Sequence, residues 1–151
     1  MTPKEYLQQV AQAERMIRTI NARIDHYHDL IMGSPMNMEN TPVTHSKGSS
    51  RTEMIAVGIA DALDRLNANL GAYKAIVSHA EKMIDQVPQE TYRRILTLRY
   101  LCGWKLPRIG EELKYEDRNS IYRAHGFALT AFGKVMRNQD GTGQEDDRRF
   151  V

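Results

Sequence analysis

Apolar residues follow two long periodic series in the first 87 residues. Both series alternate intervals of four and three positions, which is the heptad spacing of a coiled coil. Because a lone amphipathic helix gains little stability in water, each stripe needs an apolar partner. The sequence therefore predicts two long helices that fold back on each other as an antiparallel helical hairpin. The two series are Tyr6, Val10, Ala13, Ile17, Ile20, Ile24, Tyr27 and Ile31, and then Ile59, Leu63, Leu66, Leu70, Tyr73, Val77, Ala80, Ile84 and Val87.

A segment without this period, residues 33–51, separates the two series and contains turn and breaker residues such as Pro35 and Pro42. We interpret it as a flexible connector within a hairpin domain that spans residues 1–87. The second helix is expected to be longer than the first by roughly two or three turns. The excess stripe from Ala80 to Val87 then needs to pack on the C-terminal domain or on another subunit.

From Pro88 the pattern changes to three shorter helices. Proline lacks a backbone donor and restricts the preceding residue, so Pro88 ends the long helix. Helices are expected over about 89–101, from near Pro107 to Leu113, and over about 118–136, with Asp117 or Asn119 as the cap of the third. A short helix, a tight turn and a longer helix make a helix-turn-helix domain, here residues 88–137. The predicted fold class is all-α, and the polar, glycine-bearing residues 138–151 are expected to form a disordered acidic tail.

Charge is distributed unevenly along the chain. Residues 88–137 hold ten Lys or Arg against five Asp or Glu, a net charge of +5, whereas residues 1–87 hold nine against ten and residues 138–151 hold two against four. A basic segment of this kind is typical of a nucleic-acid surface, and a solvated basic helix face is the alternative interpretation.

Two stretches carry a resemblance to a known family. Residues 98–113 read LRYLCGWKLPRIGEEL and residues 123–129 read RAHGFAL. Both are similar to region four of bacterial sigma factors, the second to the end of its recognition helix. The opening MTPKEYL and the hairpin architecture resemble phage-encoded, sigma-like regulators of Gram-positive bacteria, the neighbourhood of the phage late-transcription activators. The turn before the third helix holds about one residue more than the sigma pattern, and Glu116 and Asp117 stand where the recognition helix begins.

The resemblance implies a transcriptional regulator that binds promoter DNA, RNA polymerase or both. The side chains that it places toward the groove are Arg118, Asn119, Ser120, Tyr122 and Arg123. Arginine reads guanine edges and asparagine reads adenine edges, while serine and tyrosine more often contact phosphate or sugar. The side chains that it assigns to phosphate contacts are Lys105, Arg108 and Lys114.

Other functions are weighed against this one. A phage DNA-packaging component of the small-terminase type also combines a helix-turn-helix domain with oligomerising helices, and a module that binds only protein is a third alternative. Homo-oligomerisation through the hairpin is left open. The single Cys102 excludes an internal disulfide, and we expect it to be a small buried residue. No catalytic motif, cofactor site, signal peptide or membrane span is recognised, so we expect a non-enzymatic protein in the bacterial cytoplasm.

Overall fold

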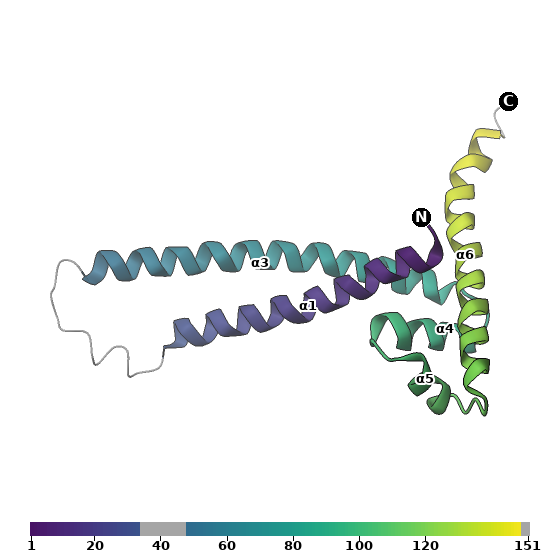
Figure 1. Ribbon diagram of the computed structural model, residues 1–151. Helices are drawn as coiled ribbons and strands as arrows, with labels where there is room; N and C mark the ends of the chain where they lie inside the picture. Colours follow the sequence, from purple (N-terminus) through teal and green to yellow (C-terminus); the bar gives the residue numbers. More distant parts are fainter. Residues whose placement is uncertain (34–47, 149–151) are drawn as a thin grey trace. The chain divides into compact units, whose positions relative to one another are not determined.

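The computed structural model describes residues 1–33 and 48–148, and the regular secondary structure of this described part is all helix, without a strand. This confirms the predicted all-α class. None of the described helices is long and apolar enough to cross a membrane. The elements in chain order are α1 (Pro3–Met32), α3 (Gly48–Asp85), α4 (Glu90–Leu96), the π-helix η1 (Thr97–Leu101), α5 (Leu106–Glu112) and α6 (Arg118–Arg148), as labelled in Figure 1.

The first helix begins with reciprocal capping. The backbone N–H of Thr2 donates to Glu5 Oε2 at 2.9 Å, and the backbone N–H of Glu5 donates to Thr2 Oγ1 at 3.2 Å. This is a capping box, and Pro3 occupies the first helical position, where its missing N–H is not needed. The start of α1 is therefore fixed by local chemistry.

The chain divides into two compact units whose boundary differs from the one we predicted. The first unit contains Met1–Glu14 and Ala75–Val151, and the second contains Arg15–Lys74. We expected the boundary at Pro88, with all of residues 1–87 in the hairpin. Instead, the first turns of α1 and the last turns of α3 belong to the same unit as α4, α5 and α6.

A single hydrophobic core explains why the first unit includes both ends of the predicted hairpin. Leu7 is fully buried in this core, and the ring of Tyr6 stacks on Phe132 of α6 with 5.8 Å between ring centroids. The excess apolar stripe of α3 therefore packs on the C-terminal helices of the same chain rather than on another subunit. The buried members of the core are Leu7, Met83, Ile84, Val87, Ile95, Leu96, Tyr100, Leu106, Ile109, Ile121, Ala124, Ala128, Phe132 and Val135.

The second unit, Arg15–Lys74, contains the rest of α1 and α3 as far as Lys74. In both figures these two segments run side by side in opposite directions. Ile20 and Leu66 are buried, as their places in the two heptad series predict. The seam weakens toward the end of α1, because Ile31 is 53% exposed. The helix α3 begins at Gly48 rather than after Arg51, and residues 34–47 of the predicted connector lie outside the described residues.

The last helix is longer than the sequence suggested. We expected it to end near Met136 and residues 138–151 to be disordered, but α6 continues to Arg148. The prediction is therefore wrong for residues 138–148. The two glycines in this stretch have low helix propensity, but no proline follows Pro107. Adding residues to an existing helix costs much less than starting a new one, so the helix continues.

Candidate nucleic-acid interface

The turn between α5 and α6 is built by the backbone of α5. Lys114 has a φ of 61°, in the left-handed region that non-glycine residues seldom adopt. The backbone N–H of Lys114 donates to the carbonyl of Glu111 at 3.2 Å, and that of Tyr115 donates to the carbonyl of Gly110 at 2.8 Å. These two bonds form a Schellman motif, which stops α5 and satisfies its last carbonyl groups. The turn thus has a defined geometry despite the absence of a glycine at its left-handed position.

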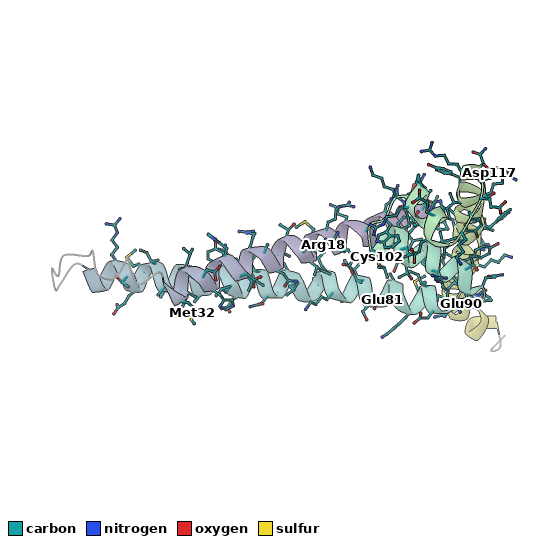
Figure 2. All side chains as sticks on the ribbon, turned by 90° about the horizontal axis from the view of Figure 1, so that it is seen from below. Arg18, Met32, Glu81, Glu90, Cys102 and Asp117 are labelled. Atoms are coloured by element: carbon teal, nitrogen blue, oxygen red, sulfur yellow. The ribbon has the colours of Figure 1, made fainter. Side chains whose placement is uncertain are left out.

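Asp117 caps the helix that follows. Its carboxylate Oδ1 accepts from the backbone N–H of Asn119 at 3.2 Å, and its carbonyl accepts from the backbone N–H of Ser120 at 3.0 Å. Of the two candidate caps, the structure selects Asp117, which is labelled in Figure 2 at the beginning of α6. A carboxylate at this place also interacts favourably with the helix dipole.

A close approach holds α5 and α6 together. A Cβ atom on Gly110 would lie 3.2 Å from Cγ2 of Ile121, which is closer than ordinary van der Waals contact. Gly110 and Ile121 are both buried. The absence of a side chain at position 110 therefore lets the two helices meet near the start of α6, so the orientation of its first turns is determined by packing.

Four of the five residues predicted to face the groove share one exposed face on the first two turns of α6. Arg118, Asn119, Tyr122 and Arg123 are all exposed, and none of their side chains makes a hydrogen bond or ion pair within the described part of the chain. Ser120 differs, because it is half-buried and a helix turns by about 100° per residue. Its side chain therefore lies about a third of a turn away from the other four.

The three predicted phosphate contacts lie outside α6. Lys105 is the exposed N-cap residue of α5, and Lys114 is exposed in the turn before α6. Arg108 is also exposed, but its guanidinium carbon lies 3.7 Å from the centroid of the Trp104 ring. This cation–π contact restricts the arginine side chain more than the other two.

A polar pair that sequence reasoning missed joins η1 to the first third of α6. The Tyr100 hydroxyl and His125 Nε2 are 2.8 Å apart, and the two rings stack with 5.8 Å between centroids. Burial lowers the pKa of His125 from its ordinary value, and the nearby cations Arg99 and Lys4 lower it further. Burial also raises the pKa of Tyr100. His125 is therefore held neutral beside the phenol.

The segment around this pair is fixed by further bonds. The backbone N–H of Cys102 donates to the carbonyl of Thr97 at 3.0 Å, which closes the π-helical turn, and Arg99 Nη1 donates to the carbonyl of Trp104 at 3.1 Å. The Cys102 side chain is exposed, so our expectation that it would be buried is wrong. The residue follows the end of η1, where the chain leaves the core.

Comparison of the chain with protein family models, with curated proteins and with solved structures finds no match.

Proposed function

We propose that this protein is a DNA-binding transcriptional regulator of the sigma-factor-like type. In this proposal α5 and α6 form a helix-turn-helix unit, and the first two turns of α6 enter the major groove of promoter DNA. The observation that carries the proposal is the exposed face of Arg118, Asn119, Tyr122 and Arg123. These side chains have no partner within the described residues, on a helix start whose position is fixed by the Asp117 cap and by packing on α5.

The chemistry of that face suits base reading at the centre and phosphate contact around it. The two arginines can donate two parallel bonds to a guanine edge, and Asn119 can do the same to adenine. Tyr122 can donate to phosphate or sugar oxygens. Lys105, Arg108 and Lys114 then supply positive charge for the phosphate backbone, which positions the domain without reading sequence. Ser120 contributes least to this surface because it lies to one side of it.

Acidic residues limit the affinity that this surface can reach alone. Glu116 and Asp117 are exposed directly before the basic residues and would repel nearby phosphates. The Asp117 carboxylate is partly compensated because it accepts the Asn119 N–H at 3.2 Å. We therefore expect modest affinity for DNA alone and tighter promoter binding when RNA polymerase is present.

The test compares two double variants with the same loss of charge. Arg118→Ala with Arg123→Ala should weaken binding to the protein's target promoter at least tenfold, since a lost base contact costs about 1–3 kcal/mol. Arg15→Ala with Arg23→Ala removes two exposed arginines of α1 in the second unit and should leave binding within about twofold. Fluorescence anisotropy measures both affinities, and circular dichroism checks that each variant keeps its helical content.

The target promoter is found first, by footprinting on the promoters of the genome that encodes the protein, with and without RNA polymerase. A salt titration should show a steep loss of affinity, because counterions are released from the phosphates that the protein contacts. Equal binding by the two double variants would contradict the assignment of the first turns of α6 to the groove.

A further inference from the structure

Exposed apolar side chains gather at one end of the second unit. Six of the ten large apolar side chains that are exposed among the described residues come from the end of α1 or the start of α3. In both figures α3 extends beyond the end of α1, where Met32 is labelled in Figure 2. Clustered exposed apolar residues mark interaction surfaces more often than isolated ones do. The six residues are Leu30, Ile31, Met32, Met54, Ile55 and Val57.

Two of these residues lie on a face of α3 that is separate from its heptad seam. At about 100° per residue, Met54, Val57, Gly58 and Asp61 share one side of the helix, with Arg51 at its edge. Met54 is 72% exposed and Val57 is 60% exposed. A Cβ atom on Gly58 would meet nothing within 4 Å, so there is open space over this glycine. We name these five residues the α3 outer face.

We propose that two copies of the chain associate through the α3 outer face, with the two helices antiparallel across a two-fold axis at position 56. An isologous contact of this kind repeats every pairing twice. Met54 then lies opposite Gly58 of the partner subunit, and the open space over the glycine receives the methionine side chain. Arg51 lies opposite Asp61 of the partner subunit, so each end of the contact carries one pair of opposite charges.

The charges favour a second copy over an unrelated protein. Arg51 and Asp61 are both exposed, and neither makes an ion pair within the described part of the chain. Arg51 and Asp61 lie at equal distances in sequence before and after position 56. A single two-fold axis at this position therefore pairs Arg51 with Asp61 of the partner subunit. The same axis pairs the large Met54 with the small Gly58. The contact covers only about three turns of helix and is smaller than a standard stable interface. The dimer is therefore reversible, with a dissociation constant in the micromolar range.

Sedimentation equilibrium over micromolar to near-millimolar concentrations of the full chain measures the association. The native protein should move from monomer to dimer over this range. Met54→Glu should weaken the association at least tenfold, because it places an unpaired carboxylate in the apolar centre of the contact. The position is exposed in the monomer, so the variant should fold, and circular dichroism verifies this.

A charge exchange tests the register of the pairing. Arg51→Asp and Asp61→Arg should each weaken the dimer several-fold, because each places like charges opposite one another. The double variant with both substitutions should recover the native dissociation constant to within about threefold. Lys74→Glu, which changes an exposed charge on another side of α3, should leave the constant unchanged.

Three outcomes would overturn the proposal. The first is a monomer at every concentration, and the second is a closed ring of many copies. The third is a dimer in which the charge exchange fails to recover affinity, or in which Lys74→Glu weakens association as much as Arg51→Asp does. The measurement needs no DNA, so its result is independent of the proposed promoter binding.

Discussion

Replacement of Leu7 by alanine tests whether the first turns of α1 belong to the same folded unit as α6. Leu7 is fully buried in the core that contains Phe132, and its neighbour Tyr6 stacks on that phenylalanine. A hairpin that was separate from the C-terminal helices would not place a residue so near the start of the chain in this core. The substitution therefore distinguishes the observed division of the chain from a boundary at Pro88.

The expected cost follows from the burial of the side chain. Leucine-to-alanine substitutions in well-packed cores cost about 2–5 kcal/mol, and leucine and alanine are both good helix formers. We expect a loss of about 3 kcal/mol in the free energy of unfolding of the first unit. With a urea dependence of about 2 kcal/mol/M, the unfolding midpoint should fall by about 1.5 M.

Tryptophan fluorescence provides a specific assay for this unit. Trp104 is the only tryptophan in the sequence, and it packs against the core of the first unit. Its emission during urea unfolding therefore reports on that unit. Leu30→Ala is the matched control, because it is the same substitution on the same helix at a side chain that is 53% exposed. Leu30→Ala should change the free energy of unfolding of the first unit by less than about 0.5 kcal/mol.

The placement of Leu7 in a shared core with α6 is refuted if Leu7→Ala leaves the Trp104 transition where it is in the native protein. It is refuted equally if Leu7→Ala and Leu30→Ala shift the transition by the same amount, because burial would then not be the cause.

Four further predictions concern the polar contacts of α6 and the turn before it. Tyr100→Phe removes the 2.8 Å bond to His125 and should lower the free energy of unfolding by about 1 kcal/mol, measured in urea. The pKa of His125 is lower in the folded protein than in the unfolded chain, so the unfolded chain takes up a proton first as the pH falls below about 6.5. The free energy of unfolding should therefore decline below this pH. His125→Gln should make this decline less steep. Asp117→Ala should cost about 1 kcal/mol by removing the cap, whereas Asp117→Asn should cost much less; equal losses would exclude capping as the reason. Lys114→Gly removes the steric strain of a non-glycine residue in the left-handed region and should raise the melting temperature. It should also weaken DNA binding, because it removes a proposed phosphate contact. A lower melting temperature would show that Lys114 is not strained.

Local signals in the sequence predicted most helix boundaries. Pro88 and Pro107 mark the end of α3 and the start of α5, and Asp117 marks the start of α6. Each acts through its own backbone or side chain, so no knowledge of the tertiary structure is needed. The end of α6 had no such stop signal, and the two glycines beyond Met136 were too weak to replace one.

Tertiary partners were harder to predict. A heptad pattern shows that Val10 or Ile84 faces an apolar surface, but it does not say which surface. The sequence therefore paired the first long helix with the second along its whole length, and it left two possible partners for the end of α3, the C-terminal domain and another subunit. The bond between Tyr100 and His125 had no local signal at all, because it joins two elements that meet only through the fold.

The sequence also predicted only part of the candidate interface. The spacing of Arg118, Asn119, Tyr122 and Arg123 places them on one helical face, and the structure has them exposed there. Ser120 was included because it is adjacent in sequence, yet each step along a helix turns the side chain by about 100°. The left-handed Lys114 was not foreseen, because glycine is the residue that normally marks such a position.

The burial of Leu7 against residues near the other end of the chain has a consequence for biosynthesis. A ribosome releases residues 3–14 long before residues 118–135, so the core of the first unit cannot close until α6 has been made. Until then, the apolar side chains in the first turns of α1 are without their native partners in α6. Contacts between residues so distant in sequence also slow folding, because a large loop must be closed before they form. The surface proposed to read DNA is therefore completed only after nearly all of the described residues have been synthesised.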